Sequence, residues 1–303
     1  MRWEDYRQSD NVEDRRGDPA AGPSMGGLPI GGGKLGIGGL IIVGIIALAL
    51  GIDPMVLIGN TDRILNSPQF EQPRPTSAPT RPTAPPQDQL GKFVSTVLAQ
   101  TEDVWKPLFE KQGQRYTEPR LVLFTRATQS ACGFAQSATG PFYCPQDRRV
   151  YLDLSFFREL SERFRAPGEF AQAYVIAHEI GHHVQNLTGI LPRVQKEMQA
   201  LPRPQSNARS VQLELQADCF AGVWAYHADA RFRILEPGDV EKALAAANAI
   251  GDDRLQKRTQ GQVVPDSFTH GSSAQRVAWF TAGLKSGDMA KCNTFTSGAL
   301  PGG

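Results

Sequence analysis

An uncharged run of eighteen residues, Leu35 to Ile52, divides the chain into two unequal parts. At about 1.5 Å per residue a helix of this length would span roughly 27 Å, which is enough for the hydrocarbon core of a bilayer. We therefore predict one transmembrane helix over residues 35–52. The alternatives are a buried helix of a soluble protein and a signal peptide cleaved at the A-x-A sequence of residues 47–49.

The segments on either side of this run are poor in core-forming residues. Residues 1–34 carry charges of both signs and are predicted to form a separate polar segment. Residues 53–89 hold most of a proline-rich stretch that is typical of a stiff linker. The folded domain is then expected over residues 90–296, followed by a tail over 297–303. Lys+Arg 32 against Asp+Glu 31 argues against a nucleic-acid partner held by a basic surface.

The pattern of the domain is that of an α+β fold with a small sheet. Apolar residues recur at helical spacing over residues 93–108, which predicts an opening helix. Short apolar runs at residues 121–124 and 150–154 predict strands. A long helix is expected from Gly168 to Thr188, and a second one after an N-cap at Ser206.

The first long helix carries the sequence H-E-I-G-H at residues 178–182. His178 and His182 are four positions apart, so both imidazoles project from one face and can bind a single Zn²⁺. Glu179 adjoins them and can serve as a general base. His183 points roughly 140° away from His178 and is not expected to be a ligand. The alternative is a pair of core histidines without a metal.

The second helix carries two acids four positions apart, Glu214 and Asp218, in an apolar surrounding. A buried carboxylate needs a cation, and catalytic zinc usually takes three protein ligands and keeps one position open. We therefore predict Glu214 as the third ligand and Asp218 as the acid that orients a ligand histidine. The alternative is an ordinary acid pair that faces solvent.

H-E-I-G-H followed by E-L-Q-A-D resembles the gluzincin metallopeptidases, in which E-x-x-x-D on a second helix completes the zinc site. The chain more closely resembles a bacterial, membrane-anchored family of neutral zinc metallopeptidases, nearly from end to end. This resemblance implies a zincin-like domain with a peptide or protein substrate. The blocks that carry it are MRW, NVEDRRG, GPFYCPQDRRVYLDLSFF, AYVIAHEIGHHVQNL, LELQADCFAGVWA and GQVVPDSFTHGSSAQRVAWF.

The resemblance also implies roles for residues outside the zinc motif. A late H-P-x-x-x-x-R element of membrane gluzincins suggests that His270 and Arg276 lie near the active site, although Gly271 stands here in place of the proline. His270 is then a candidate oxyanion donor, and the alternative is a loop histidine that caps the next helix. An edge strand before the motif helix, here residues 150–154, would align the substrate. We assign no role to His227.

Four cysteines without a C-x-x-C sequence favour disulfides in an oxidising compartment. We expect Cys132 to pair with Cys144 and Cys219 with Cys292. Three pairings are possible, and four buried thiols in a cytosolic domain are the alternative. The expected location is the bacterial cytoplasmic membrane, crossed once, with the N-terminus inside and the catalytic domain outside.

The predicted function is hydrolysis of peptide bonds by a membrane-anchored metallopeptidase with one Zn²⁺. His178, His182 and Glu214 would hold the metal, Glu179 would act as base, and His270 would assist. The alternative is a binding or chaperone module of the cell envelope that keeps the zinc site but is idle or weakly active.

Overall fold

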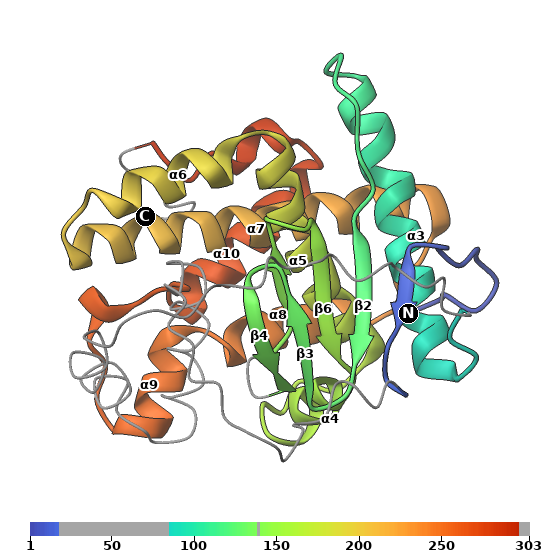
Figure 1. Ribbon diagram of the computed structural model, residues 1–303, viewed down its shortest axis with the longest axis horizontal. Coiled ribbons are helices and arrows are strands. Elements are labelled where there is room, and N and C mark those ends of the chain that lie inside the picture. The colour runs from blue at the N-terminus through green and yellow to red at the C-terminus, as the bar shows by residue number, and fades with distance from the viewer. Residues whose placement is uncertain (18–84, 138–139, 297–303) are drawn as a thin grey trace, which may run out of the picture.

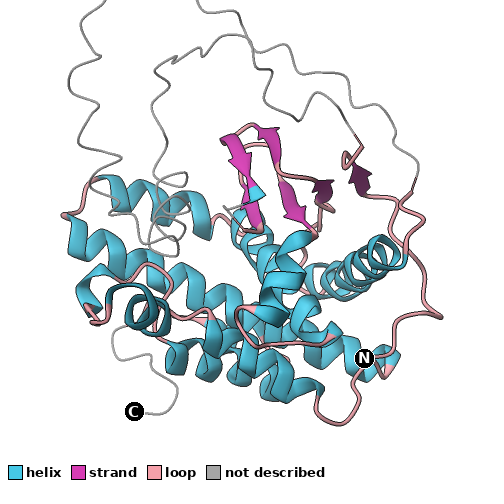
Figure 2. Cartoon of the chain, turned by 90° about the horizontal axis from the view of Figure 1, so that it is seen from below, coloured by secondary structure: helices cyan, strands magenta, loops and turns pink. Residues whose placement is uncertain are grey.

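The computed structural model describes residues 1–17, 85–137 and 140–296. Its helices lie on one side of a small sheet (Figures 1 and 2), which confirms the predicted α+β class. The sheet has four strands in the order β1-β2-β6-β5, and β3 and β4 form a separate hairpin. The strands are β1 (Val12–Asp14), β2 (Arg120–Phe124), β3 (Ala127–Ser130), β4 (Gly133–Gln136), β5 (Phe142–Cys144) and β6 (Arg149–Asp153).

The two faces of the sheet pack against different layers, as strand alternation requires. In β2, Leu121 and Leu123 belong to the main core, which the sheet shares with the helices. Val122 and Phe124 belong to a smaller cluster on the opposite face of the sheet. That smaller cluster includes Ala135 of the β3–β4 hairpin. β1, β2 and β6 run parallel, and only β5 is antiparallel to its neighbour.

Helix α5, which carries the H-E-I-G-H sequence, packs against α7, and α7 also packs along α10. The range predicted for α5, Gly168 to Thr188, agrees with the structure to within one residue at each end. The helices are α3 (Gln89–Glu110), α4 (Ser155–Glu162), α5 (Glu169–Leu187), α6 (Ile190–Gln199), α7 (Arg203–Phe232), α8 (Asp239–Ala249), α9 (Asp252–Gln260) and α10 (Ser273–Ser286), with short 3₁₀ turns η4 (Pro265–Ser267) and η5 (Met289–Cys292).

Glycines let these helices approach closely. A Cβ on Gly181 of α5 would lie 2.9 Å from the carbonyl oxygen of Ala217 on α7. A Cβ on Gly283 of α10 would lie 2.0 Å from the carbonyl oxygen of Cys219. Both distances are too short for any side chain, so at these two points the backbones of α5 and α10 lie directly against that of α7.

Residues 1–17 pack on the domain rather than forming the separate segment that we expected. β1 extends the sheet beside β2, and Trp3 is buried with its ring edge-on to Phe93 of α3. The Trp3 indole N–H donates to Glu169 at the start of α5. The few apolar residues of this segment are widely spaced, so its composition concealed its place in the core.

Two further expectations differ from the structure. The second long helix begins at Arg203, with Pro202 at the N-cap and Pro204 in its first turn, so that Ser206 lies inside the helix. Proline is favoured in a first turn because it lacks an N–H that would be unpaired there. β6 pairs with β2 and β5 on its two sides, so residues 150–154 do not form a sheet edge.

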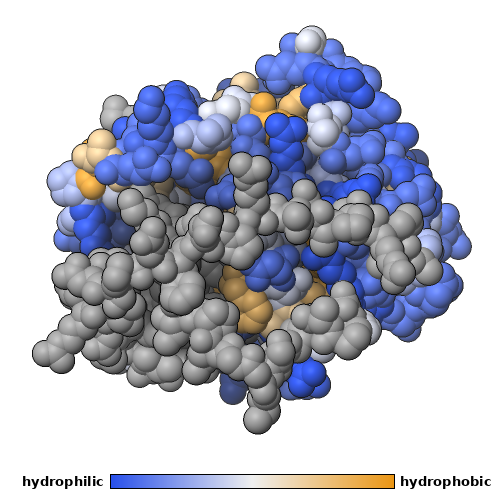
Figure 3. Space-filling model, viewed as in Figure 1, coloured by the Kyte–Doolittle hydropathy of each residue, from blue (hydrophilic) through white to orange (hydrophobic). Residues whose placement is uncertain are grey.

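The predicted transmembrane run, most of the linker and the C-terminal tail lie outside the described residues. Within the described ranges, none of the helices combines the length and the apolarity needed to cross a bilayer. The described side chains that are visible in Figure 3 are mostly hydrophilic, with small apolar areas between them. Most of the large apolar side chains of these ranges are buried, and the exposed ones are few.

Candidate metal centre

His178, His182 and Glu214 form a cluster whose ligand atoms all lie within 4.8 Å of one another. The two histidines come from successive turns of α5, and Glu214 comes from α7. His178 Nε2 is 3.1 Å from Glu214 Oε2, and His182 Nε2 is 3.4 Å from Glu214 Oε1. The three residues predicted as ligands are therefore brought together at one point.

The buried ion pair of Asp218 and Arg276 contacts His178 at Nδ1, the ring nitrogen that faces away from Glu214. The Nδ1 atom of His178 is 2.9 Å from Asp218 Oδ1, which is the contact expected for the acid that orients a ligand. Arg276 binds both carboxylate oxygens of Asp218, each at 2.9 Å. Tyr174, one turn before His178, donates its hydroxyl to the same carboxylate. This arrangement leaves Nε2 of His178 facing Glu214.

A neutral amide holds His182. Its Nδ1 atom is 2.9 Å from Gln185 Oε1, and Gln185 is fully buried. Our sequence interpretation missed both Gln185 and Tyr174. The signal was present, because Tyr174, His178, His182 and Gln185 follow one face of α5 at spacings of three and four residues.

The charges of the cluster are arranged to bind a cation. Burial alone would lower the pKa of His178, but Asp218 and Glu214 raise it to about 10. Burial works to raise the pKa of the Glu214 carboxyl, yet the charges of His182, His270 and His178 hold it well below its usual range. The carboxylates of Asp218 and Glu214 thus favour a positive charge at His178, and a metal ion bound to Nε2 would supply that charge in place of the proton.

The donor set fits Zn²⁺. Two imidazoles that each have Nδ1 engaged elsewhere present Nε2 to the same point, together with one carboxylate. Two histidines and one glutamate are the protein ligands of several catalytic zinc sites, and a structural site would normally have four.

Glu179 follows His178 directly on α5 and is buried. Burial raises the pKa of its carboxyl, and the neighbouring histidine charges oppose that rise. A carboxyl group with a raised pKa is better suited to take up a proton near neutral pH.

His270 lies in the loop before α10 and is buried. Its Nδ1 atom is 3.3 Å from Asp252 Oδ1, and its backbone N–H donates to Asp252 Oδ2. The cap of α10 is Ser272, in a reciprocal arrangement with Gln275, so the alternative reading of His270 as a helix cap is wrong. The charge of His270 is one of the causes that lower the pKa of Glu214, so the two side chains interact electrostatically.

The other histidines and the cysteines have structural partners. His183 contacts the Tyr143 hydroxyl and the Thr117 carbonyl, so it faces away from the cluster. His227 bonds the carbonyl of Gly287. The structure contains both expected disulfides, Cys132–Cys144 and Cys219–Cys292.

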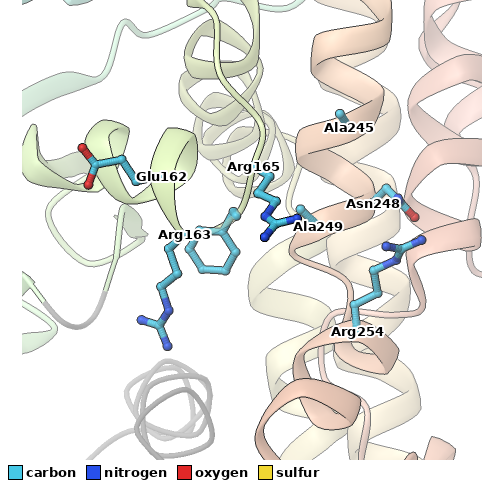
Figure 4. A pocket seen from close by; sticks show the side chains of 8 residues that line it. Glu162, Arg163, Arg165, Ala245, Asn248, Ala249 and Arg254 are labelled. Atoms are coloured by element: carbon cyan, nitrogen blue, oxygen red, sulfur yellow. The ribbon is translucent and has the colours of Figure 1, made fainter.

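A pocket of about 570 Å³ lies apart from the cluster (Figure 4). It is bordered by the end of α4 and by α8 and α9, and its polar lining includes Arg163, Arg165 and Arg254. None of the three cluster residues lines it, so it is separate from the metal centre.

Comparison with known proteins agrees with this donor set. A family model described as "Putative neutral zinc metallopeptidase" matches residues 1–295. "Uncharacterized protein YpfJ" of Escherichia coli (strain K12) is 50% identical over 299 residues, covering 97% of this chain and 99% of that protein. "Uncharacterized protein Rv2575" of Mycobacterium tuberculosis (strain H37Rv) is 46% identical over 207 residues, covering 65% of this chain and 68% of that protein. No solved structure gives a significant match.

Proposed function

Because the chain belongs to this neutral zinc metallopeptidase family, we propose that it hydrolyses peptide bonds at the cluster of His178, His182 and Glu214. The observation that carries the proposal is the donor set. Three protein ligands converge, which would leave the fourth position of a tetrahedral zinc site to a ligand from outside the protein, and the buried carboxyl of Glu179 lies beside them. A site built only for structure would need neither the open position nor that carboxyl.

A zinc ion bound here would acidify a water molecule and polarise the scissile carbonyl. The side chains supply the remaining chemistry. Glu179 takes the proton of the attacking water and delivers it to the leaving amine. Asp218, held by Arg276, keeps His178 in one orientation. His270, held by Asp252, donates to the oxygen that becomes negative during the attack.

We place the substrate along β5 rather than β6. β6 is paired on both sides, whereas β5 is the last strand of the four-stranded sheet and antiparallel to its neighbour. Tyr143 in the middle of β5 contacts His183 of α5, so this edge lies against the motif helix. An extended peptide can add to such an edge through backbone hydrogen bonds.

The test is cleavage of a mixed peptide library, read by mass spectrometry, with the full chain. A fragment that began at the linker would lack β1, so the full chain is the correct material. We expect the zinc-loaded protein to cut and the Glu179→Gln variant to be inactive while it binds the same zinc. Zinc binding without cleavage in either protein would favour the binding or chaperone module instead.

The compartment is a second part of the proposal. Two disulfides favour an oxidising compartment. The β1–β2 pairing places residues 1–17 in the same folded unit as residues 85–296, whereas a single crossing between them would put them on opposite sides of a membrane. We therefore replace the single crossing that we expected by a topology in which both segments share one extracytoplasmic side.

Single cysteines at exposed positions test this topology in cells. Gln8→Cys reports on the N-terminal segment and Lys111→Cys on the end of α3, and the native cysteines are all in disulfides. A membrane-impermeant maleimide should label both positions in intact cells. If the reagent labels residue 111 in intact cells but reaches residue 8 only after lysis, the result would support the single crossing that the sequence predicted.

A further inference from the structure

His182 is held by a chain of neutral amides, and we propose that this chain is the device that positions it as a metal ligand. We call it the amide relay: Gln185, Gln216 and the carbonyl group of Cys292. Gln185 and Gln216 would be positioning residues, and the Cys219–Cys292 disulfide would anchor the far end. The inference rests on the proposed metal centre and assigns roles outside it.

The relay runs from α5 across α7 to η5. Gln185 Oε1 lies 2.9 Å from His182 Nδ1. The Nε2 atom of Gln185 donates to the Leu213 carbonyl at 2.7 Å and to Gln216 Oε1 at 3.1 Å. Gln216 Nε2 donates in turn to the Cys292 carbonyl at 2.8 Å. Both glutamine side chains are buried.

The two backbone carbonyls fix the direction of every bond in the relay. A carbonyl oxygen only accepts, so Gln216 must turn its NH₂ group to Cys292 and its oxygen to Gln185. Gln185 must then turn its NH₂ group to Leu213 and Gln216, and its oxygen to His182. An oxygen at that place can only accept from Nδ1–H. His182 is thereby held as the tautomer whose Nε2 lone pair is free for a metal.

The relay differs from the support of His178 in charge. His178 is held by a carboxylate that Arg276 neutralises, whereas the relay carries no net charge. A second carboxylate behind His182 would face the Leu213 carbonyl and the Gln216 oxygen, both acceptors. A glutamine can satisfy all three neighbours, and a glutamate cannot.

The disulfide at the end of the relay belongs to the same unit. Cys219 lies in α7 next to Asp218, and Cys292 ends η5. Their bond holds η5 against α7, and it is the Cys292 carbonyl that receives the Gln216 amide. Reducing this disulfide would free the Cys292 carbonyl, which is the acceptor that fixes the orientation of the Gln216 amide.

The test measures the zinc dissociation constant of the full chain by competition with a chromophoric chelator. Gln185→Met keeps the length of the side chain and removes the amide, and we expect binding about 10- to 100-fold weaker. The matched control is Gln100→Met, which removes a buried amide that has no hydrogen-bond partner in the described ranges. Unfolding of each metal-free variant is recorded separately, so that loss of folding is distinguished from loss of affinity.

A double-mutant cycle tests the anchor. Gln216→Met and the double variant Cys219→Ala/Cys292→Ala should each weaken zinc binding, and their combination should cost less than the sum because both act on one contact. Removal of Cys132 and Cys144, which lie outside the relay, should leave the constant unchanged. Additive effects would show that the disulfide does not act through Gln216.

Two outcomes overturn the inference while leaving the proposed function intact. One is wild-type zinc affinity in Gln185→Met. The other is a long-range ¹H–¹⁵N spectrum of the zinc-loaded protein that shows the His182 proton on Nε2 instead of Nδ1. If the wild type binds zinc no better than Glu214→Gln, the metal centre itself is refuted. The assay therefore separates the two claims.

Discussion

At the scale of single residues, the support of the centre depends on a buried charge pair, in which Arg276 is 3% and Asp218 0% exposed. Arg276→Met would leave the carboxylate of Asp218 buried without its cation, since Arg276 binds both of its oxygens. Removing one partner of a buried pair typically costs about 3–5 kcal/mol. We expect a loss of this size in the free energy of urea unfolding of the metal-free protein. Arg254→Met, at an exposed arginine, should change it by less than about 0.5 kcal/mol.

The pair of Asp252 and His270 predicts a dependence of stability on pH. Burial would raise the pKa of Asp252, but His270 and the backbone N–H groups of the loop lower it below the usual value. A carboxyl group with a lowered pKa stabilises the fold above its unfolded pKa of about 3.9, and this contribution is lost as the pH falls through the folded value.

Asp252→Asn should therefore be less stable than the wild type at pH 6 by about 1–3 kcal/mol, because an amide is a weaker acceptor for those N–H groups. The difference should shrink as the pH falls from 4 towards 2. Denaturant unfolding across this range checks it. A constant difference at every pH would mean that the pKa of Asp252 is the same in the folded and the unfolded protein, which would contradict the argument.

At the scale of secondary-structure elements, the approach of α7 to α5 brings Glu214 and Asp218 to the histidines. Gly181→Ala would place a methyl group 2.9 Å from the Ala217 carbonyl oxygen, so the helices must separate. Overpacking of this kind costs about 1–3 kcal/mol, and zinc affinity should fall with it. Gln172→Ala, at a partly buried position of the same helix, serves as control. An unchanged zinc dissociation constant in Gly181→Ala would contradict the packing argument.

The N-terminal strand gives a second prediction at this scale. Trp3 is buried against Phe93 and donates to Glu169, so Trp3→Ala should lower the free energy of unfolding by about 3–5 kcal/mol. The exposed neighbour Arg2 is the control, and Arg2→Ala should have little effect. Equal stability of the two variants would indicate that residues 1–17 do not belong to the domain.

At the scale of the whole molecule, the sequence predicted the centre better than it predicted the frame around it. The spacing of His178 and His182 on one helix face is a property of a single element, and it needed no tertiary information. Glu214 could be assigned because a buried acid pair demands a cation. The direction of the Gln185 amide could not be assigned, because it depends on the Leu213 carbonyl of another helix.

Apart from the start of α7, Tyr174 and Gln185, what the prediction missed depends on long-range contacts. Whether residues 150–154 form an edge depends on where β5 pairs, and the polar composition of residues 1–17 does not show that β1 extends the sheet beside β2, more than a hundred residues later. Periodicity identifies elements, whereas the order of strands follows from the packing of the complete chain.

The central claim is that zinc at this cluster, with Glu179, hydrolyses peptide bonds. The most direct test is a titration of metal-free full-length protein with zinc while the initial rate of peptide cleavage is followed. We predict that the rate rises in proportion to zinc up to one equivalent and then stays constant. Glu179→Gln should bind the same equivalent and show no cleavage. Cleavage without zinc, or undiminished cleavage by Glu179→Gln, would contradict the account.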